Sequence, residues 1–238
     1  MPQLGWPQAI EQVTKRVVKL TTPRASGTGF ILSPILGSSF VVVATAAHVI
    51  DNSHYWEEPI RVQRADSSET VLLHATERAI FLDEAFDTAA LLFHSDILTV
   101  PPEPIELTPE GKFLPIGNEV GWLGYPAVAN ALCFFSGRIS AMLHDQRAYL
   151  VDGVAINGVS GGPAFHVLGG QKLVVVGVVS AYIPNRATGE ALPGLSVVRD
   201  VVQFQALAKQ FASIKEAKEK EVVPSTPPPP PERPPDAG

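Results

Sequence analysis

Cysteine is almost absent from this 238-residue chain, because Cys133 is the only one. A single thiol cannot form a disulfide within the chain, so a domain held together by disulfides is excluded. Cys133 lies in the apolar run 131–135, a setting typical of a buried and unreactive thiol. The sequence therefore disfavours a secreted, disulfide-rich protein.

The chain also lacks an excess of positive charge, since its formal net charge is −6. A nucleic-acid-binding domain needs a basic surface to bind the phosphate backbone, so nucleic acid is not an expected partner. No P-loop, dinucleotide-binding fingerprint or paired Cys/His spacing occurs in the sequence. We therefore expect no metal and no cofactor.

No long apolar segment opens the chain. Charged residues interrupt the first twenty positions at Glu11, Lys15, Arg16 and Lys19. A signal peptide or a membrane-spanning helix requires an uninterrupted apolar stretch. We therefore expect a soluble protein located in the cytoplasm.

Short apolar runs rich in Val, Ile and Phe recur from about residue 17 to residue 198, separated by Gly, Pro, Asn and Ser. This pattern predicts an all-β fold, either a barrel or a sandwich. The clearest runs are 28–32, 40–44, 69–73, 88–93, 119–123, 137–142 and 173–180.

Residues 99–114 contain four prolines and few strand-forming residues, which is typical of a linker. The linker divides the predicted domain, residues 1–205, into two β-rich halves. We expect a first barrel at about 17–98 and a second at about 115–198.

Helical spacing appears at both ends of the chain. Ile10, Val13 and Val17 follow Pro7 at intervals that predict a short N-terminal helix. A second apolar stripe predicts a C-terminal helix at 199–222, which we expect to dock on the second barrel. Its members are Val197, Val201, Phe204, Ala208, Phe211 and Ile214.

The last segment, 223–238, is rich in proline and almost free of apolar side chains, so we expect it to be disordered. Its P-x-x-P spacing at 227–235 is also found in ligands of SH3-type grooves. The segment is therefore either a site that recruits a partner or a passive, solubilising tether.

The most specific motif is Gly158-Val159-Ser160-Gly161-Gly162-Pro163. A glycine-rich turn can present Ser160 as a nucleophile, because glycine adopts backbone conformations closed to other residues. The backbone N–H groups of Gly158 and Ser160 would then form an oxyanion hole. The alternative interpretation is an ordinary turn between two strands.

His48 follows an apolar strand and the small residues Thr45, Ala46 and Ala47. Imidazole titrates near neutral pH, so His48 is our candidate for a general base. Any single histidine is more often a structural residue than a catalytic one. The other five have no comparable setting and are interpreted in that way: His54, His74, His94, His144 and His166.

Asp87 stands at the head of the apolar strand 88–93. A partly buried carboxylate at this place can accept the second N–H of the histidine and hold its tautomer. Asp83 and Glu84 are nearby competitors for the role, and a strand-capping aspartate is the alternative interpretation. We favour Asp87 because the strand begins immediately after it.

Together these motifs resemble the trypsin-like serine peptidases, and among them the HtrA/Deg type without disulfides. The segments GTGF at 27–30, TAAH at 45–48 and DTAAL at 87–91 follow the order of the family. Further similar segments are VGWLGYP at 120–126, FSGRIS at 135–140 and DGVAINGVSGGPAF at 152–165. The resemblance spans about residues 10 to 205.

The resemblance implies an all-β, chymotrypsin-like fold of two packed six-stranded antiparallel Greek-key barrels, flanked by the short N-terminal helix, the C-terminal helix and the disordered Pro-rich tail. It implies a serine endopeptidase acting on a protein or peptide substrate, with the catalytic residues His48, Asp87 and Ser160. The substrate-binding positions that it implies are Val154, Ala155, Ser180, Ala181 and Tyr182. Val154 and Ala155 at the floor of the pocket favour small or aliphatic side chains, because an unpaired cation there would be costly to bury.

Two features depart from the pattern of the family. Val159 replaces the acid or asparagine that commonly precedes the serine, so no carboxylate is available there to pair with a newly cut N-terminus. No PDZ-like module follows in the sequence, so peptide-triggered switching of the HtrA kind is not implied. A catalytically silent, peptide-binding scaffold with a Pro-rich tail that recruits partners remains the alternative function.

Overall fold

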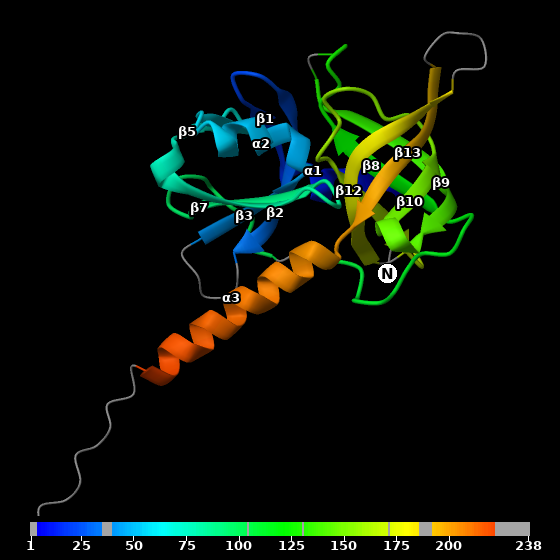
Figure 1. The fold of residues 1–238 in the computed structure, drawn as a ribbon. Helices are drawn as coiled ribbons and strands as arrows, with labels where there is room; N and C mark the ends of the chain where they lie inside the picture. The colour runs from blue at the N-terminus through cyan, green and yellow to red at the C-terminus, as the bar shows by residue number, and fades with distance from the viewer. Residues whose placement is uncertain are drawn as a thin grey trace, which may run out of the picture.

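The computed structural model describes residues 4–34, 40–103, 105–129, 131–170, 172–185 and 192–221. Its strands form two lobes that lie side by side (Figure 1). The first lobe contains β1 (Val17–Thr21), β2 (Ser26–Pro34), β3 (Phe40–Thr45), β4 (Ile60–Arg64), β5 (Thr70–Leu73), β6 (Arg78–Asp83) and β7 (Thr88–His94). The second contains β8 (Glu119–Gly124), β9 (Cys133–Leu143), β10 (Ala148–Asp152), β11 (Pro163–Leu168), β12 (Lys172–Asn185) and β13 (Leu192–Asp200).

The first lobe is a seven-stranded antiparallel sheet in the order β5-β4-β1-β2-β3-β7-β6. We expected six strands. The additional one arises because a 3₁₀ turn, η1 (Ala75–Glu77), splits the segment 70–83 into β5 and β6. The first half of this segment pairs with β4 and the second half with β7, so one interrupted segment links the two edges of the sheet.

The second lobe is a closed six-stranded barrel in the order β10-β13-β12-β11-β8-β9. Its longest strand, β12, pairs with β11 from Lys172 to Val178 and with β13 from Gly177 to Asn185. The chymotrypsin-like, all-β class predicted from the sequence is therefore confirmed.

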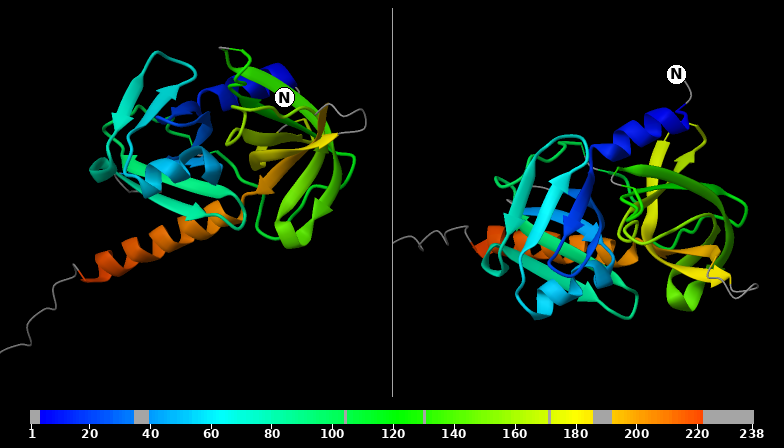
Figure 2. Two further views of the ribbon diagram at one scale, coloured as in Figure 1. Left: turned by 45° about the horizontal axis from the view of Figure 1, so that its top comes forward. Right: turned by 90° about the horizontal axis from the view of Figure 1, so that it is seen from above.

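Three α-helices and a second 3₁₀ turn complete the described fold: α1 (Trp6–Thr14), α2 (Ala47–Tyr55), α3 (Val202–Glu221) and η2 (His144–Gln146). Helix α1 lies at the interface between the lobes (Figure 2), where Ala9 and Val13 are buried. Helix α2 directly follows β3 and was not predicted. None of the described helices is long and apolar enough to cross a membrane.

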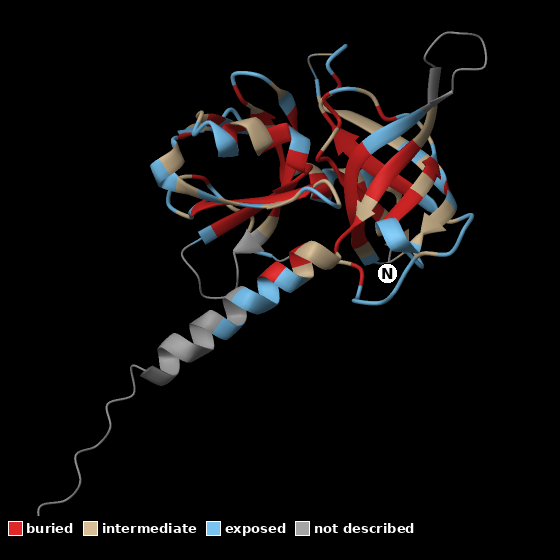
Figure 3. Ribbon diagram, in the orientation of Figure 1, coloured by how far each residue is buried: buried red, intermediate tan, exposed pale blue. Residues whose placement is uncertain are grey.

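Each lobe has its own apolar core, and a third cluster spans the interface between the lobes (Figure 3). This interface cluster includes Phe204 and Leu207 of α3 together with Phe30 and Leu92 of the first lobe. The rings of Phe30 and Phe204 meet edge to face, with centroids 6.4 Å apart. Helix α3 therefore packs against the first lobe, and our expectation that it docks on the second barrel was wrong, because β13 ends at the interface and the helix continues across it.

Two further expectations concern single parts of the chain. Cys133 is partly exposed rather than buried, since it opens β9 next to the turn that follows β8. The Pro-rich segment predicted to be disordered, 223–238, lies outside the described residues.

Candidate active site

His48 stands in the first turn of α2, immediately after the buried strand β3. Its Nδ1 lies 3.0 and 2.9 Å from the two carboxylate oxygens of Asp87, and its backbone N–H donates to Asp87 Oδ1 at 3.1 Å. An ionised carboxylate can only accept hydrogen bonds, so the hydrogen of the neutral imidazole is on Nδ1. Nε2 is thereby left as a hydrogen-bond acceptor.

Asp87 closes the turn that joins β6 to β7, and its backbone adopts a left-handed conformation with φ of 50°. Asp83, one of its competitors, accepts a hydrogen bond from the backbone N–H of Phe86 at 3.3 Å. Glu84, the other competitor, accepts a hydrogen bond from the hydroxyl of Tyr55. Asp83 therefore stabilises the turn, and Glu84 binds Tyr55 at the end of α2. Of the three acids only Asp87 contacts His48.

The hydroxyl of Ser180 donates a hydrogen bond to Asp87 Oδ2 at 2.5 Å. Ser180 belongs to β12 of the second lobe, so this bond joins the two lobes at the carboxylate. We had interpreted Ser180 only as a substrate-binding position. No local pattern around Ser180 indicates the bond, because its partner lies 93 positions away in the sequence.

The pKa values of this pair follow from the same contacts. The hydrogen bond to Asp87 raises the pKa of His48 above its ordinary value, although desolvation opposes the effect. Burial by itself would raise the pKa of the Asp87 carboxyl, but hydrogen bonds from His48 and Ser180 hold that pKa below its ordinary value. The carboxylate is therefore ionised at neutral pH.

Ser160 lies in the loop between β10 and β11, and Thr28 of the first lobe holds this loop. The Thr28 hydroxyl donates to the carbonyl of Gly158 at 2.8 Å, and its backbone N–H donates to the carbonyl of Ser160 at 2.8 Å. Gly158 has φ of 92°, and a Cβ atom there would overlap the carbonyl oxygen of Tyr125. Glycine is therefore required at this position both by conformation and by space.

The two N–H groups predicted to form an oxyanion hole have no hydrogen-bond acceptor within the described part of the chain. The carbonyl of Asn157 accepts from Ala127 N–H at 2.7 Å, and the carbonyl of Val159 accepts from Gly162 N–H at 3.0 Å. In a trans peptide the N–H points opposite to the C=O. The N–H of Gly158 therefore points away from Ala127, and the N–H of Ser160 points away from Gly162.

The hydroxyl of Ser160 donates to the backbone carbonyl of Ser180 at 3.3 Å. Among the described residues no hydrogen bond joins it to His48. In this state the nucleophile candidate is bound to the strand rather than to the base.

Ser160, His48 and Asp87 nevertheless line one cavity of about 250 Å³. The remaining lining residues are Ala155, Ile156, Asn157, Val179, Ser180, Ala181 and Tyr182. Val154 is half exposed and is not among them. The sequence interpretation missed Ile156 and Asn157, although both directly precede the glycine-rich loop.

The strand β12 forms one side of this cavity. From Ala181 to Tyr182 it pairs with β13, whereas its ladder with β11 ends at Val178. One edge of the strand therefore faces the cavity without a neighbouring strand. Among the described residues there is no cluster of three or more His, Cys, Asp or Glu side chains that could hold a metal ion.

The sequence matches the trypsin-like peptidase domain over residues 27–178, a range that includes His48, Asp87 and Ser160. The match covers more than half of the chain, so the protein belongs to the trypsin-like peptidase family. It is a hydrolase of the serine endopeptidase class.

Several solved structures share the fold. The inactive form of Rv3671c from M. tuberculosis H37Rv has a TM-score of 0.56 and 22% identity, over 92% of this chain and 93% of its own. The serine endoprotease from Yersinia pestis has a TM-score of 0.64 and 20% identity, over 88% of this chain and 67% of its own. Deg5 has a TM-score of 0.61 and 17% identity, over 84% of this chain and 90% of its own. No curated protein matches the sequence.

The resemblance to the trypsin-like serine peptidases that the motifs indicated is thus confirmed, and the Deg-type peptidase Deg5 shares the fold. Identities this low support nothing finer than the fold. The catalytic assignment of single residues and the substrate preference therefore depend on the geometry of this chain.

Proposed function

We propose that the protein hydrolyses peptide bonds through an acyl-enzyme formed on Ser160, with His48 as general base and Asp87 as the acid that orients it. The observation that carries the proposal is the His48–Asp87 pair, with Nδ1 2.9 Å from Oδ2, in the same cavity as Ser160. A histidine held in this tautomer has Nε2 free to take the proton of a serine hydroxyl.

The chemistry would proceed in two halves. Ser160 Oγ attacks the substrate carbonyl while His48 takes its proton, and the N–H groups of Gly158 and Ser160 bind the oxygen that becomes negative. His48 then gives the proton to the leaving amine. Water, activated by His48 in the same way, releases the acyl group and restores the serine.

The resting hydrogen bond of Ser160 to the Ser180 carbonyl suggests how a substrate prepares the site. An extended peptide lying along the open edge of β12 presents its own N–H groups to the carbonyls of that strand. A substrate N–H that binds the Ser180 carbonyl would displace the Ser160 hydroxyl. Rotation about the Cα–Cβ bond then directs Oγ toward Nε2 of His48.

The lining of the cavity supports a preference for small or aliphatic side chains before the scissile bond. Apart from His48 and Asp87 the lining is uncharged, and Ala155 and Ala181 contribute only methyl groups. Tyr182 narrows the space from the strand edge. Burying a lysine or arginine there without a partner would be costly, so basic residues are disfavoured.

Fluorophosphonate labelling followed by mass mapping tests the proposed function. We expect a label on Ser160 that is lost in His48→Ala, because the hydroxyl then lacks its base. His94→Ala is a matched control, since His94 forms a comparable pair with Asp96 on the surface, its Nδ1 lying 2.6 Å from Oδ1. Absence of label in the folded native protein would instead favour the catalytically silent, peptide-binding scaffold.

A further inference from the structure

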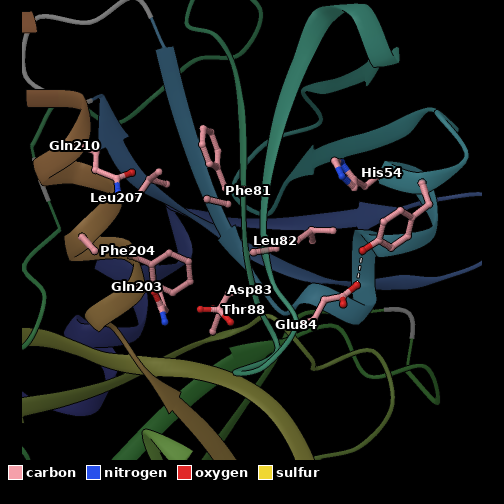
Figure 4. Close-up of a pocket in the computed structure, with 14 residues that line it drawn as sticks. His54, Phe81, Leu82, Asp83, Glu84, Thr88, Gln203, Phe204, Leu207 and Gln210 are labelled. Carbon is pink, nitrogen blue, oxygen red and sulfur yellow. Dashed lines mark hydrogen bonds between the residues drawn. The ribbon is translucent and has the colours of Figure 1, made fainter. Parts of the chain in front are cut away.

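The turn that carries Asp87 is held only weakly by its own hydrogen bonds. It contains residues 84–87 and directly follows Asp83, the last residue of β6 (Figure 4). The N–H of Phe86 donates to Asp83 Oδ1 at 3.3 Å. The N–H of Asp87 donates to the carbonyl of Glu84 at 3.4 Å. Both bonds are longer than the usual N–H···O distance of about 2.9 Å, so contacts from outside the turn are needed to keep Asp87 in place.

The backbone of Asp87 also needs such contacts. Its φ of 50° lies in the left-handed region, which residues with a Cβ atom rarely adopt. A conformation of this kind persists only where the surrounding structure holds it. Ser180 holds the carboxylate, through its hydrogen bond to Oδ2 at 2.5 Å. That bond does not reach the preceding residue, Phe86, whose side chain makes a separate contact.

The partner of Phe86 is an arginine of the other lobe. Phe86 is half-buried and belongs to none of the three apolar clusters that the described residues form. Arg147 lies over its ring, with the guanidinium carbon 4.9 Å from the ring centroid. A cation within about 6 Å of an aromatic face is attracted by the negative charge of that face. Because Arg147 directly precedes β10, this contact joins the second lobe to the turn of the first.

Arg147 is itself fixed by the second lobe. Its N–H donates to the carbonyl of His144 at 3.1 Å, and its carbonyl accepts the N–H of Asp200 at 2.9 Å. Burial raises the pKa of the Asp200 carboxyl and the charge of Arg147 opposes this effect, so the guanidinium lies near that group. With φ of 48°, Arg147 is also left-handed. Glycine would be unstrained there, so an arginine at this position indicates a role for its side chain.

We propose that Arg147 is a positioning residue for the hydrolytic reaction: its guanidinium holds the ring of Phe86 and thereby the turn that places Asp87. The inference rests on the proposed function, in which Asp87 orients the catalytic histidine. Arg147 does not line the cavity around Ser160, so it acts through the acid and not on a substrate bound there. Together with Ser180, it makes the position of the acid depend on the packing of the two lobes.

The imidazole of His48 reports the position of Asp87 without any substrate. An NMR titration of the ring nitrogens gives the pH midpoint of His48 in the full-length protein, whether or not the protein is active. The hydrogen bond from Asp87 raises the pKa of His48, and the charge of Asp51 adds to this effect. Phe86→Leu removes the ring and leaves every charge in place. We expect the midpoint to move to lower pH in this variant, because Asp87 is then less well placed.

Arg147→Met shows whether the arginine acts by contact or by charge. Loss of a nearby positive charge would by itself raise the pKa of His48, whereas misplacement of Asp87 would lower it. Arg147 is half-exposed, so solvent screens the effect of its charge. We therefore expect a lower midpoint, and no further change when Phe86→Leu is added, because the contact is already lost. Arg147→Lys keeps a cation near the ring and should restore most of the native midpoint.

Arg24→Met is a matched control. Its guanidinium lies over the ring of Trp56, 5.9 Å from the centroid, and not over the turn that carries Asp87. This substitution should leave the midpoint of His48 unchanged. With a peptide substrate, Arg147→Met should lower kcat about tenfold and change KM little, because a misplaced acid impairs the transition state and not substrate binding. Arg24→Met should change neither constant.

Three results would overturn the proposal. The first is a midpoint of His48 that stays unchanged or moves to higher pH in Arg147→Met, and the second is an equal shift in Arg147→Met and Arg147→Lys. The third is an unchanged midpoint in Phe86→Leu, which decides the question even if Arg147→Met does not fold. Absence of fluorophosphonate label on Ser160, together with the expected midpoints, would count against the proposed function and still support the positioning of Asp87.

Discussion

The hydroxyl of Thr28 donates to the carbonyl of Gly158 across the interface between the two lobes, at 2.8 Å. The same oxygen accepts the backbone N–H of Tyr125 at 3.0 Å. Thr28 is fully buried, so water cannot replace either bond. One side chain of the first lobe thus fixes the loop that presents Ser160 in the second.

Replacing this hydroxyl by a methyl group, in Thr28→Val, should therefore impair both stability and activity. Two buried backbone groups lose their partner, which lowers the free energy of unfolding by about 1–3 kcal/mol. We expect kcat/KM for a peptide substrate to fall at least tenfold, because the N–H of Gly158 is no longer held in place. Thr28→Ser retains the hydroxyl and should preserve most of the activity. Equal losses in both variants would contradict this role of the hydroxyl.

The activity should depend on pH through His48. The base must be neutral to accept the serine proton, and its pKa is raised above the ordinary 6.5 by the hydrogen bond to Asp87. Activity is therefore lost as the pH falls, and the half-maximum of kcat/KM should lie above pH 6.5. In Asp87→Asn the amide no longer stabilises the imidazolium, so the half-maximum should move to lower pH.

The same Asp87→Asn variant should lower kcat/KM by roughly 10⁴-fold, because an amide in this place can hold the wrong tautomer of the histidine. Measuring kcat/KM across pH with one peptide substrate gives both the pH of the half-maximum and the loss of activity. Asp96→Asn, which alters the surface pair with His94, is the control and should change neither. An unshifted profile in Asp87→Asn would mean that another group controls the titration.

The residues of the candidate site differ in how far the sequence reveals them. His48, Asp87 and Ser160 each stand in a local motif, because small residues, a strand start or glycines must surround such a group. The bonds from Thr28 and Ser180 were not predicted, since Thr28 lies 130 positions from Gly158 and only the tertiary fold brings them together. The cavity around Ser160 is likewise formed only by the tertiary fold, so the sequence led us to name Val154 rather than Ile156 and Asn157 among the residues that line it.

The prediction of secondary structure was also limited by what only the tertiary fold determines. The alternating and apolar runs predicted most strands, but not α2, whose nine residues include Val, Ile, Asp and Asn, all of them weak helix formers. This helix forms because Val49 and Ile50 are buried in the core of the first lobe. The apolar stripe of α3 was evident, yet a stripe does not specify which surface it covers.

The proposed role of the Gly158 N–H in the oxyanion hole can be tested by adding one methyl group to this residue. Gly158→Ala places a Cβ against the carbonyl oxygen of Tyr125, so the loop must move. We expect kcat to fall by about 10²–10³-fold, as for the loss of one oxyanion donor, while the His48–Asp87 pair remains. Gly117→Ala is a matched control, because Gly117 has a similar φ of 89° and no neighbour within 4 Å of the added atom. A fully active Gly158→Ala would argue against an oxyanion role for this N–H.

Specificity should depend on Tyr182, which lines the cavity from the edge of β12 and is 38% exposed. Tyr182→Gly removes the ring that narrows the space, so larger side chains gain room and apolar contact. We expect the ratio of kcat/KM for phenylalanine over alanine before the scissile bond to rise about tenfold, the usual effect of a change in fit of an apolar pocket. A peptide library that varies this single position measures the ratio directly. Ile183→Gly weakens the same strand at the next residue, which does not line the cavity, so it should leave the ratio unchanged. If both variants broaden the preference alike, strand flexibility rather than the ring of Tyr182 sets the specificity.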